Sequence, residues 1–204
     1  MLNQIRPAVA LLLLITILTG IIYPLAMTAI SQTLFPRQAN GSLIVQNGKV
    51  IGSSLIGQNF TSDKYFHGRP SATTTADPND AAKTIAAPYN AANSGGSNLG
   101  PTSEALMDGV KSAAAGLHAE NAQAPVPVDL VTASGSGLDP DISPAAAQFQ
   151  IPRIAKARYL PENALEALVK KHTESRIFGI FGEPRVNILA LNMALDTLAQ
   201  GKPK

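Results

Sequence analysis

The chain has no cysteine and no tryptophan, and few of its 204 residues are charged. Without cysteine it can form no disulfide, catalytic thiolate or cysteine-ligated zinc site. Its 16 basic and 14 acidic residues give a net charge of +2, so no strong field of one sign favours nucleic acid. Aromatic residues make up only 5% of the chain, and a hydrophobic core must therefore come from Leu, Ile, Val and Ala.

Several catalytic patterns are also missing. The histidines, His67, His118 and His172, lack the paired spacing of a zinc site. No G-x-x-x-x-G-K-[ST] loop is present, which excludes that mode of phosphate binding. Ser134 and Ser136 lack the preceding glycine of a G-x-S-x-G elbow. A membrane-anchored hydrolase using either serine with His67 or His172 stays open as a hypothesis, because triad geometry is spatial.

One long apolar run stands near the N-terminus. Residues 8–30 are 23 residues without a charge, or roughly 35 Å of helix, which spans a bilayer core. A cleaved signal peptide is the alternative, but its apolar region is about 7 to 15 residues long, and no A-x-A site follows here. We predict an uncleaved anchor; the alternative is a secreted solute-binding module released by cleavage near Ala29.

The flanking charges orient this anchor. Arg6 and the N-terminal amine precede the span, and Arg37 is the basic residue close behind it. The positive-inside rule then predicts a short cytoplasmic segment, 1–7, and an extracytoplasmic domain, 36–204.

Small and weakly polar residues recur along the anchor. Thr16, Gly20, Pro24 and Thr28 are spaced by four, and such faces let helices associate in lipid. We predict that this face contacts a partner helix. The alternative is that these residue types are simply common in membrane helices.

The remaining residues predict a single α+β domain, because a chain of this length supports one core. Asn47-Gly48 lies between two β-rich runs and predicts a hairpin over 42–58. Residues 71–98 are mostly small and polar and predict a long, exposed, flexible loop. Four helical segments are predicted: 102–117, a segment that starts at the Ser143 cap and breaks at Pro152, 161–175, and Pro184 to Gly201. Strands are predicted at 126–130 and 176–183.

Two polar segments could be functional sites or structural turns. "NFTSDKYFHGRPSAT" at 59–73 contains Tyr65, His67 and Arg69, but nothing else supplies their nucleophile, metal or base. We interpret it as a rigid turn that packs or docks the domain. "TASGSGLDPD" at 132–141 either presents backbone N–H groups to an anion or forms a turn into the Ser143-Pro144 helix start.

The anchor, the segments at 59–73 and 132–141, and the later "GEPRVN" block resemble, in that order, the C subunit of the Kdp-type potassium-transporting ATPase of bacteria and archaea. The resemblance runs from the anchor to about Leu195, and "SGSGLDPDISP" and "GEPRVN" are its most specific blocks. "YLPEN" at 159–163 departs from the family, because a Gly and a Ser-type cap are expected there.

The resemblance implies a non-catalytic accessory subunit, single-pass in the inner membrane. Its partners would be a potassium-conducting subunit, a P-type pump that hydrolyses ATP, and a very small hydrophobic subunit. This chain lacks the D-K-T-G-T phosphorylation sequence of the pump. Tyr65, His67 and Arg69 would then dock the domain over the potassium-conducting subunit.

The family is also described as a catalytic chaperone that raises the pump's affinity for ATP, with "TASGSG" likened to the signature motif of ABC transporters. No cofactor would be bound tightly. The positions that inherit contact with ATP are Ser134, Gly135, Ser136, Gly137 and Gln148. An anchor with a cytoplasmic N-terminus, however, places these residues across the membrane from cytosolic ATP.

Overall fold

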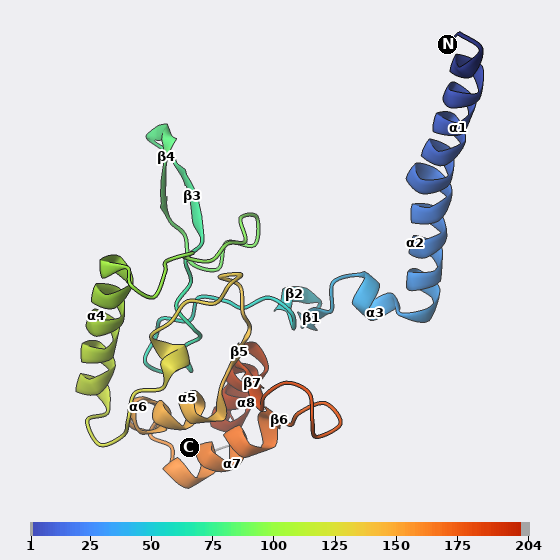
Figure 1. Cartoon of the computed structure of the whole chain (residues 1–204). Helices are drawn as coiled ribbons and strands as arrows, with labels where there is room; N and C mark the ends of the chain where they lie inside the picture. The colour runs from blue at the N-terminus through green and yellow to red at the C-terminus, as the bar shows by residue number, and fades with distance from the viewer. Residues whose placement is uncertain (1, 201–204) are drawn as a thin grey trace. The chain divides into compact units, whose positions relative to one another are not determined.

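A computed structural model describes residues 2–200. The chain divides between Ser53 and Ser54 into two compact units. The elements of the first unit are η1 (Leu2–Gln4), α1 (Ile5–Ile17), the π-helical turn η2 (Leu18–Ile22), α2 (Tyr23–Leu34), α3 (Pro36–Ala39), β1 (Leu43–Gln46) and β2 (Lys49–Ser53) (Figure 1).

The apolar run forms one helix from Ile5 to Leu34. At 30 residues it is long and apolar enough to cross a membrane, and none of its most apolar window is buried within the chain. The predicted hairpin follows it: β1 and β2 pair antiparallel, with Asn47 and Gly48 at φ 51° and 75°. The hairpin is therefore confirmed.

The π-helical turn has a local cause. Pro24 has no N–H, and its ring crowds the carbonyl of Gly20 four residues earlier. The helix widens there, and the Tyr23 N–H donates to the Leu18 carbonyl five residues back. In an uninterrupted helix Thr16 and Pro24 would lie about 80° apart around the axis; one inserted residue reduces this to roughly 20°. The turn thereby gathers the predicted small-residue face.

The second unit is α+β, as predicted (Figure 1). Its elements are β3 (Thr74–Asp77), β4 (Asp80–Ala86), α4 (Glu104–Glu120), η3 (Val128–Leu130), β5 (Asp141–Ile142), α5 (Pro144–Phe149), α6 (Ile151–Arg158), α7 (Glu162–His172), β6 (Thr173–Glu174), β7 (Arg185–Asn187) and α8 (Ile188–Gln200). β7 lies between β5 and β6 in an antiparallel sheet, with Val186 opposite both Ile142 and Thr173.

The core lies where α5, α6, α7 and α8 meet this small sheet. The largest fully buried side chains are Phe66, Ile154, Leu165, Leu191, Leu195, Val169, Val186 and Asn192. On α7 the predicted apolar stripe buries Leu165 and Val169, whereas Leu168 and His172 are half-buried. Ser143 is confirmed as a cap: its hydroxyl accepts the Ala146 N–H at 3.0 Å. The chain also restarts its helix at Ile151-Pro152, as predicted.

Residues 71–98 were predicted as a loop, and that prediction was wrong for 74–86. This stretch forms the β3–β4 hairpin, which points away from the helices of its unit (Figure 1). The Asp77 carboxylate accepts the Asn79 N–H at 2.8 Å, so Asp77-Pro78-Asn79 is the turn. Small residues of weak strand propensity concealed it.

Two predicted strands were also wrong. Residues 128–130 form the 3₁₀ turn η3, and 176–183 form a tight exposed loop. Pro184 precedes the strand β7 and does not begin the last helix. That helix starts after Asn187, whose side chain accepts the Ala190 N–H at 3.0 Å. The predicted helix end at Gly201 lies outside the described residues.

The family departure at 159–163 has a simple structural result. Tyr159 ends α6 in the left-handed conformation at φ 55°, within the stretch where a glycine was expected. Pro161 then precedes α7, with no side chain that caps it.

Candidate functional site

The 59–73 segment is held in the core by two buried amide side chains. Asn192 accepts the Phe66 N–H at 2.9 Å and donates to the Phe66 carbonyl at 3.0 Å. Gln150 does the same for His67, at 2.8 and 3.1 Å. Helices α8 and α5–α6 thus give this extended segment the backbone hydrogen bonds that a neighbouring strand would otherwise provide.

Tyr65 is fastened by charged groups on α6 and α8. Its hydroxyl donates to Asp196 at 3.1 Å, and the Arg158 guanidinium lies 4.6 Å above its ring. Arg158 also pairs with Asp196 at 2.7 Å and donates to the Lys64 carbonyl. The phenol is therefore engaged in a packed cation–π and hydrogen-bond network.

Arg153 holds the same segment from the other side. It donates to the carbonyls of Asp63 at 2.7 Å and Tyr65 at 3.1 Å. Its Nε lies 3.1 Å from the Glu120 carboxylate without the alignment of a hydrogen bond, so that attraction is ionic. Arg153 thereby links α6 both to the segment and to the end of α4.

The surroundings of His67 favour its neutral ring. Burial, and then the positive charge of Arg153, lowers its pKa. Its Nε2 lies 3.0 Å from the Ser62 carbonyl, which can only accept, so the proton is on Nε2. The ring supports a local turn.

Arg69 joins the two polar segments that the sequence singled out. It pairs with Asp139 at 3.0 Å and donates to the carbonyls of Ala133 and Thr132 at 3.3 and 3.5 Å. The Tyr89 hydroxyl donates to the Arg69 carbonyl at 2.7 Å, and burial raises the Tyr89 pKa to about 12. The structure thus brings 59–73 and 132–141 together.

The turn at 134–137 is built from its own serines. The Gly137 N–H donates to the Ser134 hydroxyl at 2.8 Å, and the Leu138 N–H donates to the Ser136 hydroxyl at 3.1 Å. Gly137 has φ +66°, and a Cβ there would lie 2.7 Å from the Gly95 carbonyl oxygen. In this conformation these two N–H groups are committed within the chain.

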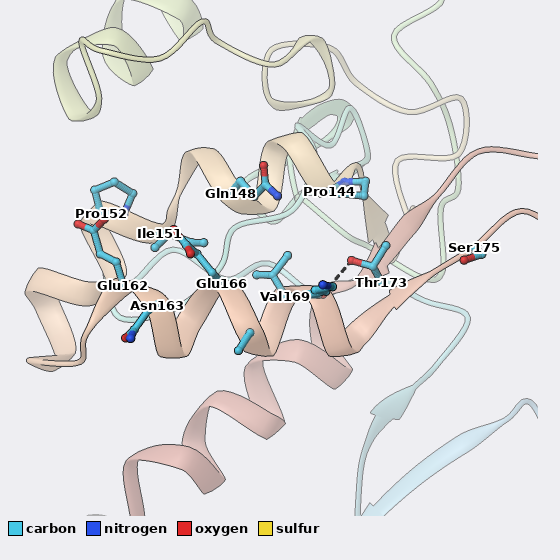
Figure 2. A pocket seen from close by; sticks show the side chains of 12 residues that line it. Pro144, Gln148, Ile151, Pro152, Glu162, Asn163, Glu166, Val169, Thr173 and Ser175 are labelled. Carbon is cyan, nitrogen blue, oxygen red and sulfur yellow. Dashed lines mark hydrogen bonds between the residues drawn. The ribbon is translucent and has the colours of Figure 1, made fainter.

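Gln148 lies elsewhere. It is exposed on α5 and lines a cleft of about 920 Å³ between α5–α6 and α7, to which residues 134–137 do not contribute. Figure 2 shows it on the helix facing Glu166 and Val169 of α7. The five residues predicted to contact ATP therefore do not share one pocket.

The described part of the chain shows neither a metal-holding cluster nor a pairing of Ser134 or Ser136 with histidine. Among residues 2–200, no three His, Asp or Glu side chains are grouped so that they could hold a metal ion. Neither Ser134 nor Ser136 is hydrogen-bonded to a histidine ring there: the Ser134 hydroxyl binds Gly137 and Ser136.

Sequence reasoning missed the residues that hold this region together. Gln150 and Asn192 are each 2% exposed although they are polar. The available signal was a single amide on an otherwise apolar helix, "ILALNMAL" around Asn192. A polar group on a buried face must find partners.

Comparison with known proteins places the chain in a family. The sequence pattern of the family described as "K+-transporting ATPase, c chain" matches residues 5–197. The chain belongs to this family. The resemblance found in the sequence is therefore confirmed, from the apolar helix to α8.

Three similar proteins carry the name "Potassium-transporting ATPase KdpC subunit". That of Bradyrhizobium diazoefficiens is 66% identical over 199 residues, covering 98% of this chain and 99% of its own. That of Rhodopseudomonas palustris strain BisB18 is 67% identical over 196 residues, covering 96% and 98%. That of Methylobacterium nodulans is 65% identical, covering 98% and 99%. The matches support neither the hydrolase nor the secreted binder.

Proposed function

We propose that this chain is the non-catalytic accessory subunit of an ATP-driven potassium uptake complex and stabilises its assembly. The observation that carries the proposal is the match over nearly the whole chain to potassium-transporting ATPase subunits. Tyr65, His67 and Arg69 bind to other groups of the same chain, which supports a structural role for them. ATP hydrolysis belongs to another subunit, the P-type pump.

The proposed partners are the potassium-conducting subunit, the pump and a small hydrophobic subunit. We propose that the anchor binds a partner helix through Thr16, Gly20, Pro24 and Thr28. Outside the helix's own backbone, a Cβ added at Gly20 would meet nothing within 4 Å in this chain, so a larger side chain there tests the contact with a partner.

The test compares Gly20→Leu with Ala26→Leu in the assembled complex. Ala26 lies two residues past Pro24, about 200° around the helix, so it faces away from the small-residue side. Gly20→Leu should reduce co-purification with the other subunits in detergent, and Ala26→Leu should not. Full recovery of the complex with Gly20→Leu would remove this face from the interface.

We also propose an orientation. The N-terminus lies in the cytoplasm, the span crosses the inner membrane, and the domain lies outside. Ser97 is exposed and the chain has no cysteine, so Ser97→Cys carries its lone thiol. A membrane-impermeant maleimide should label it in intact spheroplasts. Labelling only after the membrane is opened would reverse the orientation.

Contact of Ser134, Gly135, Ser136, Gly137 and Gln148 with ATP stays a prediction. In the proposed orientation these residues lie on the opposite side of the membrane from cytosolic ATP. The Gly137 and Leu138 N–H groups also donate hydrogen bonds to serine hydroxyls. We therefore propose that an effect of this subunit on the pump's nucleotide affinity passes through contacts between subunits.

A further inference from the structure

The loop between β6 and β7 exposes a cluster of large apolar side chains. We call residues 176–183 the apolar loop. Ile177 is 54% exposed, Phe178 88%, Ile180 72% and Phe181 65%. The loop projects from the helices and sheet of its unit (Figure 1). Large apolar side chains exposed together in one loop are typical of an interaction surface.

The apolar loop is held in one shape by its own backbone. The Ile177 N–H donates to the Phe181 carbonyl at 2.9 Å, and the Phe181 N–H returns to Ile177 at 3.0 Å. Gly179 and Gly182 take φ of 73° and 79°, which glycine adopts without strain. An Arg176–Glu183 ion pair closes the base. A preformed loop loses little conformational entropy when it binds.

Phe178 is strained at the tip of this loop. Its φ is 54°, a left-handed conformation that bulky residues rarely adopt. The backbone thus fixes this aromatic ring in an exposed position.

The charges around the loop decide what kind of surface it fits. Arg176 is paired with Glu183, and Arg185 is paired with Glu174 at 2.8 Å and Asp141 at 3.2 Å. Two arginines and three carboxylates thus lie at the base of the loop, a net charge of −1. Segments that bind anionic lipid surfaces carry surplus basic residues, which this base lacks. An uncharged apolar socket on a protein matches it better.

We propose that Phe178, with Ile180 and Phe181, inserts into an apolar socket on the extracytoplasmic surface of another subunit of the same transporter complex. The proposal rests on the proposed function, which supplies the complex and the side of the membrane. The loop is then the central contact of that interface, because buried aromatic residues carry most of the binding energy.

The main test is Phe178→Asn against a matched control, Tyr159→Asn. Tyr159 is 90% exposed and has φ 55°, nearly the values of Phe178. Asparagine tolerates the left-handed conformation, so both variants should keep the local backbone and fold. Phe178→Asn should weaken binding to the other subunits about tenfold or more, as expected for one buried aromatic side chain. Tyr159→Asn should change it less than twofold.

The outcomes separate this inference from the proposed function. If the wild-type chain does not co-purify with the transporter subunits, the proposed function fails. If it does, and Phe178→Asn binds as tightly as wild type, only the socket is refuted.

A second measurement identifies what covers the loop. Phe178→Cys introduces the chain's lone thiol, which can carry an environment-sensitive fluorophore in the full chain in nanodiscs. The emission should shift to the blue only when the other subunits are added. A shift in nanodiscs of the chain alone would assign the loop to lipid, and a shift in detergent that grows with chain concentration would assign it to a second copy. Either result overturns the socket.

Discussion

Replacing Asn192 with leucine should separate the fold of the 59–73 segment from general packing. Asn192 is 2% exposed and forms both hydrogen bonds of the Phe66 peptide groups. Leucine has the same branching and number of heavy atoms, so it leaves no large cavity. It does leave a buried N–H and a buried carbonyl without partners.

The magnitude follows from these two groups. Each buried unsatisfied group costs about 1–3 kcal/mol. Two methyl groups in place of the amide offset roughly 1–2 kcal/mol. We expect Asn192→Leu to lower the free energy of unfolding by about 2–3 kcal/mol, which is a fall in Tm of roughly 5–10 °C for a domain of this size.

The assay is thermal unfolding of the purified full chain in detergent, followed by near-ultraviolet circular dichroism of its tyrosines, since it has no tryptophan. The control is Asn163→Leu, the same exchange at an exposed position on α7, with an expected effect within about 0.5 kcal/mol. A Tm within roughly 2 °C of wild type for Asn192→Leu, or equal shifts for both variants, would refute the claim that these bonds hold the segment.

Two further predictions concern the same region. Gly57→Ala should destabilise the domain by about 1–3 kcal/mol, because its Cβ would lie 2.6 Å from the Asp139 carbonyl oxygen. The control, Gly116→Ala in α4, meets nothing within 4 Å and should stabilise the domain by about 0.5–1 kcal/mol. Urea unfolding measures both variants, and an unchanged stability of Gly57→Ala would contradict the close packing. The Tyr89 pKa is raised to about 12 in the folded chain, so its contribution to stability is complete below its unfolded value, about 10, and is lost as pH rises from there through 12. The free energy of unfolding should therefore fall more steeply over that range in wild type than in Tyr89→Phe, and parallel curves would contradict the burial of the phenol.

The local features of this protein could be read from sequence because each depends on residues close together in the chain. The uncharged run over 8–30 predicts a long helix without any tertiary information. Asn47-Gly48 can supply the positive φ angles of the first hairpin, and Ser143 supplies its own helix cap. The family itself was recognisable from short blocks such as "GEPRVN".

Only the tertiary structure decided the rest, because those features depend on partners far away in the chain. "RIFGIFGE" has the composition of a buried strand, yet its apolar groups are exposed in a loop. Arg69 looked like part of a site and is instead tied to Asp139, 70 residues away. Asn192 reaches Phe66 across 126 residues. Composition tells which side chains must find partners, and long-range packing alone tells which partners they find and which apolar groups stay exposed among the described residues.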